Sequence, residues 1–197
     1  MCVTRQKTSK SDLLRTYETS DPTQADHHCT IWEAGSATAA APLFFRPVTF
    51  KGSGEIWCDG GLKRNNPVHE AVAEVKREPT WREREIGCLL SIGTGVPRIG
   101  GVSSNLAKFL KGAVEMMTAS EDVAIDFLHL SEGRALSSTN RYFRFNVPQG
   151  MQDLQLDECS RTEEMRALTD HYLQDLKVGN EVATCARSLL APDDNCR

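Results

Sequence analysis

The stretch 55–67 constrains this chain most, because it joins a short apolar segment to the start of an amphipathic helix. Residues 56–58, Ile-Trp-Cys, favour an extended backbone. Asp59, Gly60 and Gly61 follow, and the two glycines predict a turn through positive φ. The carboxylate of Asp59 is therefore expected at the end of a strand.

A strand end is where α/β enzymes place catalytic groups, so Asp59 is a candidate catalytic residue. An Asp-Gly-Gly triplet also makes plain turns, and a turn without chemistry is the alternative interpretation. Asn65 or Asn66 offers an N-cap and Pro67 a first-turn residue, which predicts a helix directly after the turn.

Two other blocks accompany this stretch. Residues 31–45 read Ile-Trp-Glu-Ala-Gly-Ser-Ala-Thr-Ala-Ala-Ala-Pro-Leu-Phe-Phe. They predict a helix whose N-terminus is closed by a capping box of Thr30 and Glu33 and which ends at Pro42. Trp32 is expected to fill the gap that the small residues of this helix leave. Residues 86–92 are a continuous apolar run of strand length, which predicts a central parallel strand buried on both faces.

In this order and spacing the three blocks resemble the patatin-like phospholipase family, in particular its fungal members. The resemblance is dense from Thr30 to Gly95 and looser to Leu176. It implies an α/β, three-layer patatin-like fold with a mainly parallel central sheet flanked by helices. The chain is expected to hold the C-terminal portion of that domain in residues 1–178, followed by a C-terminal helix and loose tail in residues 179–197.

In this family the aspartate of the Asp-Gly-Gly/Ala motif is the partner of a nucleophilic serine, and the motif maps that role onto Asp59. The family's serine elbow, Gly-x-Ser-x-Gly, and its glycine-rich oxyanion loop lie before this region, and neither pattern occurs here. Ser36 lacks the glycines of an elbow and is expected on a helix surface. The chain is therefore expected to be inactive alone, as part of a hydrolase of lipid acyl esters that needs no metal or cofactor.

The second hypothesis is a non-catalytic module, truncated or a pseudoenzyme, that binds lipid or a protein partner. Leu43, Phe44 and Phe45 bear on it, because adjacent aromatics form either core or a lipid-facing lip. Their place beside a buried helix favours the core.

The composition restricts the class of partner. The 23 Lys and Arg against 27 Asp and Glu form no long basic run, which argues against nucleic acid. Seven cysteines are scattered without a Cys-x-x-Cys pair, which argues against a disulfide framework or a zinc site and favours an intracellular setting, cytoplasmic or peripheral to membranes. There is no apolar run long enough to span a bilayer and no evident signal peptide.

Three other patterns carry weaker hypotheses. The run 26–29, Asp-His-His-Cys, has no second ligand pair at metal-site spacing. Residues 93–95, Gly-Thr-Gly, lack the third glycine or the lysine of a nucleotide-binding loop, so a nucleotide-binding domain is the weakest alternative. His69 lies off the apolar face of its predicted helix and is expected in solvent.

The remaining periodicity predicts further elements. Apolar residues on one face and Glu70 and Glu74 on the other predict a helix that packs on a sheet after Pro67. Helices are also expected over 106–117, 118–130 and 160–178, with a break at Gly179–Asn180 before a last helix, and a strand over 141–147.

Overall fold

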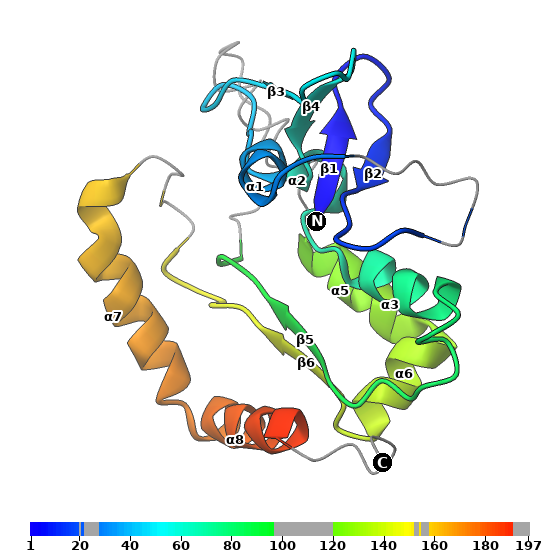
Figure 1. Ribbon diagram of the computed structural model, residues 1–197. Coiled ribbons are helices and arrows are strands. Elements are labelled where there is room, and N and C mark those ends of the chain that lie inside the picture. The colour runs from blue at the N-terminus through cyan, green and yellow to red at the C-terminus, as the bar shows by residue number, and fades with distance from the viewer. Residues whose placement is uncertain (20, 22–27, 97–119, 152–153, 155–157, 191–197) are drawn as a thin grey trace. The chain divides into compact units, whose positions relative to one another are not determined.

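The computed structural model describes residues 1–197 except 20, 22–27, 97–119, 152–153, 155–157 and 191–197 (Figure 1). The described residues fall into two compact units. One contains residues 1–83, and the other contains residues 84–96 and 121–190.

The first unit is built on a four-stranded sheet of order β2-β1-β4-β3. Its strands are β1 (Cys2–Arg5), β2 (Ser11–Leu13), β3 (Val48–Thr49) and β4 (Ile56–Asp59). All neighbours in this sheet are antiparallel. The predicted mainly parallel central sheet is therefore wrong for this unit, although the mixture of helices and strands is confirmed.

The length of the connections explains the antiparallel pairing. Residues 6–10 join β1 to β2, and residues 50–55 join β3 to β4. A parallel pair needs a crossover of a dozen or more residues, whereas these links have the length of hairpin loops. Strand β3 is two residues long and is not among the elements expected from the sequence.

Helix α1 (Ile31–Thr38) packs on this sheet, beside β1 and β4 (Figure 1). The predicted capping box is confirmed: the Glu33 N–H donates to Thr30 Oγ1 at 3.4 Å, and the Thr30 N–H donates to Glu33 Oε2 at 2.8 Å. Ala34 and Ala37 face inward, as expected for small residues at a close helix–sheet contact.

Trp57 on β4 is the centre of the core and is fully buried. Phe50 stacks on it with ring centroids 5.5 Å apart, and the Arg5 guanidinium lies 5.3 Å from its ring centroid on the sheet. Trp32, which was expected to fill this space, is instead 69% exposed. The core therefore depends on a tryptophan from the strand and not from the helix.

Helix α2 (Gly61–Arg64) follows β4 directly, and α3 (Val68–Arg77) follows α2. Val68 and Val72 of α3 are buried as predicted. Glu74, predicted to face solvent, is buried as well. A buried carboxylate is costly unless it is paired, so its partners decide whether the helix can pack this way.

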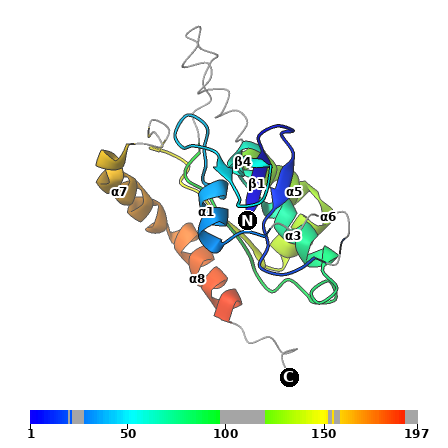
Figure 2. The same cartoon turned by 45° about the horizontal axis from the view of Figure 1, so that its top comes forward.

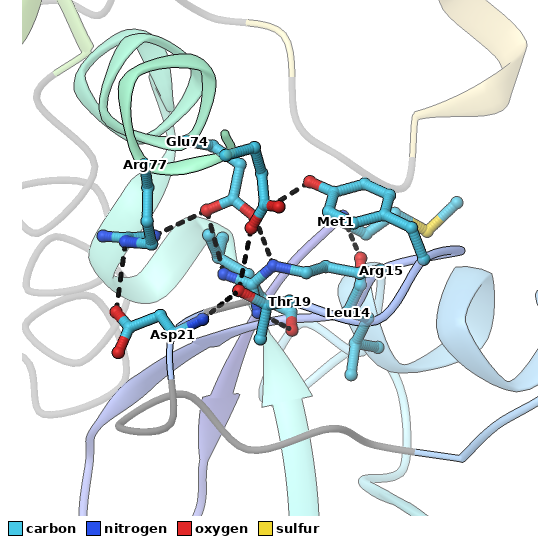
Figure 3. A network of polar contacts seen from close by, with 10 residues as sticks. Met1, Leu14, Arg15, Thr19, Asp21, Glu74 and Arg77 are labelled. Atoms are coloured by element: carbon cyan, nitrogen blue, oxygen red, sulfur yellow. Dashed lines mark hydrogen bonds and ion pairs between the residues drawn. The ribbon is translucent and has the colours of Figure 1, made fainter. Parts of the chain in front are cut away.

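Arg15 is the main partner of Glu74 (Figure 3). The Arg15 Nη2 donates to Glu74 Oε2 at 2.9 Å, and the Arg15 Nε donates to the other carboxylate oxygen. Tyr17 donates its hydroxyl to Glu74 at 2.8 Å, and Arg77 donates to it at 2.6 Å. The hydrogen bond from Arg15 is the largest of the effects that lower the pKa of Glu74 to about 2. The segment after β2 is thus fastened to α3 by one carboxylate that accepts from three side chains.

The same segment makes further contacts with α3 and the turn that follows it. Arg77 also pairs with Asp21 at 3.4 Å (Figure 3). Thr19 donates to the buried carboxylate of Glu78 at 2.8 Å. Burial is the main cause that raises the pKa of Tyr17 to about 12, and its hydrogen bond to Glu74 adds to it.

The second unit has a two-stranded sheet in which β5 (Leu89–Ile92) and β6 (Tyr142–Phe145) run parallel. The predicted parallel direction is confirmed for this pair. The predicted burial on both faces is wrong, because Ile92 is 72% exposed and Leu90 is 39% exposed.

Helices make up the rest of the second unit. Their bounds are α5 (Ser120–His129), α6 (Ser131–Ser138), the 3-10 turn η1 (Cys159–Arg161), α7 (Thr162–Leu173) and α8 (Leu176–Leu190). Figure 2 shows α8 continuing from α7 after a short interruption. The break expected at Gly179–Asn180 lies instead at Gln174–Asp175. The helix expected over 106–117 lies outside the described residues, and the division of the chain at 178/179 stays a prediction.

The helices of the described residues include none with the length and apolar character that crossing a bilayer requires.

The pairing of Glu74 predicts a pH-dependent stability of the first unit. Because its pKa is depressed in the folded state, Glu74 stabilises the fold above the ordinary carboxyl pKa of about 4.3, and this contribution is lost as the pH falls from about 5 toward 2. A Glu74→Gln change should reduce the free energy of unfolding at pH 7 by about 1.5–3 kcal/mol and flatten its decline in acid. Urea unfolding at a series of pH values measures both effects.

Glu18→Gln is the matched control, because Glu18 lies on the same segment but is exposed. It should leave the free energy of unfolding within about 0.5 kcal/mol of the parent. Equal pH profiles of the parent and the Glu74 variant would contradict the assigned role of this carboxylate.

Candidate active site

The backbone of Asp59 is fixed from two sides. It is the last residue of β4, which lies between β1 and β3, and it is in register with Val3 of β1. Its N–H donates to the carbonyl of Ala40, just after α1, at 3.0 Å. The candidate carboxylate thus stands where the sheet meets the end of α1, on a rigid support.

The side chain of Asp59 is half-buried. Its Oδ1 accepts a hydrogen bond from the Gly61 N–H at 2.6 Å. Within the part of the chain that the structure describes, no lysine or arginine forms an ion pair with it. An ionised carboxylate has about four acceptor positions, so Asp59 keeps capacity to accept a proton from a substrate or an alcohol.

Gly60 has a steric reason to be glycine. Its φ is −62°, in the right-handed helical region, so the predicted turn through positive φ is wrong. A Cβ at this position would lie 2.1 Å from the carbonyl oxygen of Cys2, a distance at which the backbone of β1 must move. Thr38 of α1 donates its hydroxyl to this same carbonyl at 2.6 Å. The glycine therefore lets the turn after β4 pass directly against β1.

Gly61 is also crowded, in this case by Asp59 itself. A Cβ on Gly61 would lie 3.0 Å from Asp59 Oδ1, the oxygen that accepts the Gly61 N–H. Helix α2 begins at this residue. The predicted N-cap is wrong, since Asn65 ends α2 and the N-cap position of α3 is Pro67, without a side-chain cap.

The other candidates from the sequence do not join Asp59. Ser36 is exposed on α1, as expected for a helix-surface serine. His69 is half-buried on α3, not in open solvent. Of the run 26–29, only His28 and Cys29 are described, and the described residues contain no group of three or more possible metal ligands.

The loop at Gly93–Gly95 is shaped by the protein itself. Asn146 Oδ1 accepts the Gly95 N–H at 2.6 Å, and the Asn146 amide donates to Glu121 at 2.8 Å. Gly95 has a φ of +110°, and a Cβ on Gly93 would lie 2.3 Å from Asn146 Oδ1. These glycines thus have a structural reason, close packing against β6, that needs no phosphate.

The apolar turn formed by Leu43, Phe44 and Phe45 is exposed, and the expectation that it lies in the core is wrong. Leu43 is 74% exposed and Phe45 is 62% exposed. Leu43 has a φ of +76°, a conformation uncommon for a residue other than glycine. Its neighbours Phe44 and Phe45 both donate their N–H to Ala41, so a tight turn holds these side chains outward. No local pattern distinguishes such a turn from a core segment.

The second unit contains an apolar cavity that sequence reasoning did not find. Its volume is about 610 Å³. Side chains of β5, β6, α7 and α8 line it, among them Leu90, Phe145, Met165, Leu173 and Cys185. The residues come from segments far apart in the chain, which explains why no sequence pattern indicated a cavity.

Comparison with a protein-family model bears on the first unit. Residues 4–72 match the family model described as patatin-like phospholipase. The match includes Asp59, Gly60 and Gly61 and confirms the resemblance for this segment.

Two relatives are animal enzymes and one is from a plant. The chain is 29% identical over 188 residues to the 85/88 kDa calcium-independent phospholipase A2 of Rattus norvegicus and of Mus musculus, which covers 82% of this chain and 22% of each relative. It is 30% identical over 132 residues to Phospholipase A I of Arabidopsis thaliana, which covers 65% of this chain and 9% of that protein. The chain thus spans less than a quarter of the length of these relatives.

The close approach at Gly60 gives a prediction for stability. Gly60→Ala should lower the free energy of unfolding by about 1–3 kcal/mol, because the added methyl group collides with the Cys2 carbonyl. Denaturant unfolding followed by tryptophan fluorescence measures the loss. Gly54→Ala is the control, since nothing lies within 4 Å of its added Cβ. Equal losses in the two variants would contradict the steric role of Gly60.

Proposed function

We propose that this chain supplies the acidic member of a serine–aspartate dyad in a lipid acyl hydrolase of the patatin-like type. Asp59 is the proposed base, and Gly60 and Gly61 complete its motif. The nucleophilic serine would come from residues that precede this region in a longer polypeptide. The observation that carries the proposal is the environment of the Asp59 side chain. It is half-buried at the end of a strand, accepts a hydrogen bond from one backbone N–H and can accept others.

The proposed chemistry needs only one proton carrier. The serine hydroxyl attacks the ester carbonyl carbon, its proton passes to Asp59, and the carbonyl oxygen becomes an oxyanion held by backbone N–H groups. When the tetrahedral intermediate collapses, Asp59 returns the proton to the departing alcohol and the acyl group stays on the serine. Water then repeats the sequence, with Asp59 as base, and releases the fatty acid.

The proposed substrates are lipid acyl esters, with phospholipids first. All three relatives are phospholipases by name, and two of them are described as calcium-independent. A dyad of serine and aspartate moves the proton through side chains and needs no metal ion. The proposed setting is intracellular, at the periphery of membranes, consistent with six described cysteines that are all free thiols.

An Asp59→Asn change tests this role in the longer polypeptide that carries the serine segment. The amide cannot accept the serine proton, so kcat should fall by about 10²–10⁴-fold on a phospholipid substrate. Release of fatty acid from phosphatidylcholine vesicles measures the rate. The 197-residue chain alone should release none and should not react with a fluorophosphonate probe.

Asp126→Asn is the matched control, because Asp126 is an exposed aspartate on α5. This variant should keep the parent rate. Undiminished turnover in the Asp59 variant would reject the dyad, and labelling of the 197-residue chain by the probe would show that it holds a nucleophile of its own.

The exposed apolar turn favours a second candidate, a module that binds a lipid surface without catalysis. Leu43 and Phe45 present large apolar side chains to solvent on a turn that is fixed by backbone hydrogen bonds. Exposed apolar clusters of this kind are typical of sites that contact membranes or partners. The first unit could therefore bind lipid even where the dyad is incomplete.

Vesicle binding tests this candidate. A Leu43→Asp/Phe45→Asp variant should co-sediment with phosphatidylcholine vesicles at least about 10-fold more weakly than the parent, since each side chain that enters the lipid contributes about 1.5–3 kcal/mol. Leu176→Asp is the control, because Leu176 is 85% exposed but lies in the second unit. Equal binding by all three proteins would exclude the apolar turn as the lipid contact.

A further inference from the structure

Two cysteines of the second unit lie close together although 97 positions separate them in the chain. The Sγ atoms of Cys88 and Cys185 are 4.0 Å apart. Cys88 lies just before β5, and Cys185 lies on α8. Both are free thiols. The spacing of the cysteines in the sequence does not predict this pair, because the contact forms only when α8 packs near β5.

The surroundings of the pair differ on its two sides. Cys185 is 4% exposed and belongs to the wall of the apolar cavity of about 610 Å³. Cys88 is half-buried and therefore more open to a small solute. An oxidant can therefore react first with Cys88, and Cys185 lies close enough to react with the oxidised Cys88.

We propose that Cys88 and Cys185 form a redox-sensitive modification site, at which a peroxide oxidises the two thiols to a disulfide that ties α8 to the start of β5. To form the bond, the Sγ–Sγ distance must shorten from 4.0 Å to about 2.0 Å.

The chemistry proceeds in two balanced steps. Cys88 attacks the peroxide, the O–O bond breaks, and the products are a sulfenic acid on Cys88 and one molecule of water or alcohol. Cys185 then attacks the sulfenic sulfur, the S–O bond breaks, and a second water leaves. The two sulfurs together lose two electrons, and the peroxide gains them. A dithiol reductant reverses the change by thiol–disulfide exchange.

The two reduced thiols react slowly with oxidants at neutral pH. Burial is the largest cause that raises the pKa of the Cys88 thiol to about 11, and the adjacent Cys185 adds to it. Since the thiolate is the reactive form, little of it is present at neutral pH. The reaction with peroxide should therefore be slow at neutral pH and should become faster as the pH rises toward 11.

The modification would act on the shape of the cavity. Cys185 belongs to the same wall as Ala186 and Leu189 of α8. Fixing this helix to the segment before β5 joins two positions that are 97 apart in the chain, and a loop of this length loses much conformational freedom in the unfolded chain. The oxidised unit should be the more stable form, with α8 unable to move away from β5.

Peptide mapping after hydrogen peroxide treatment tests the site. The expected result is one cross-linked peptide that joins Cys88 to Cys185, lighter by two hydrogen atoms than its parts, and absent after treatment with dithiothreitol. The oxidised chain should also melt at a temperature at least about 5 °C higher than the reduced chain.

Variants separate this pair from general oxidation. Cys88→Ser and Cys185→Ser should each abolish both the cross-linked peptide and the shift in melting temperature. Cys159→Ser, which removes an exposed cysteine, should change neither. Circular dichroism of the reduced variants establishes that they keep the helices of the parent.

Other disulfides would overturn the inference. A cross-link between either cysteine and Cys159, a bond only between two chains, or sulfinic acid on Cys88 without a cross-link would each show that the two thiols do not act as a pair. An unchanged melting temperature after complete cross-linking would show that the bond does not fasten α8.

Discussion

The arrangement of β1, β4 and α1 in the first unit depends on the close contact of Gly60 with the carbonyl of Cys2. Strand β4 can end beside β1, and turn at once into α2, only because residue 60 has no side chain. The same carbonyl accepts the hydroxyl of Thr38, so strand, turn and α1 meet at one backbone oxygen. Asp59 precedes this point by one residue. Its placement is thus a result of backbone packing, and any chemistry at its carboxylate depends on that packing.

The Glu74 network has a complementary role. A carboxylate on the inner face of α3 would oppose packing, but three donors surround it, and two of them come from the segment after β2. The free energy needed to desolvate such charged pairs is about as large as the attraction between them. Their main effect is therefore to fix which segment lies against which helix. The polar network thus fixes how the segments are oriented, whereas the core around Trp57 provides the buried apolar surface.

The two units differ in how they relate to function. The first carries the segment that matches patatin-like phospholipases, with the candidate acid and the exposed apolar turn. The second carries an apolar cavity and a pair of thiols at its wall. The candidate acid and the exposed apolar turn thus lie in one unit, whereas the apolar cavity lies in the other.

Local features could be predicted from the sequence because their physical causes lie within a few residues. The capping box at Thr30 and Glu33, the strand that ends at Asp59 and the apolar face of α3 all follow from hydrogen bonds and periodicity inside one turn or one strand. The candidate Asp59 belongs to this class. Its place at a strand end required only the order of apolar residues and glycines.

Tertiary structure alone decided the rest. The pairing of β1 with β4, the burial of Glu74 and the approach of Cys88 to Cys185 each depend on a partner that is distant in sequence. Gly60 shows the difference at one position: a glycine was expected there for its backbone freedom, but its backbone has an ordinary conformation. The reason for the glycine is a carbonyl oxygen 58 residues earlier, and such a reason exists only after the chain has folded.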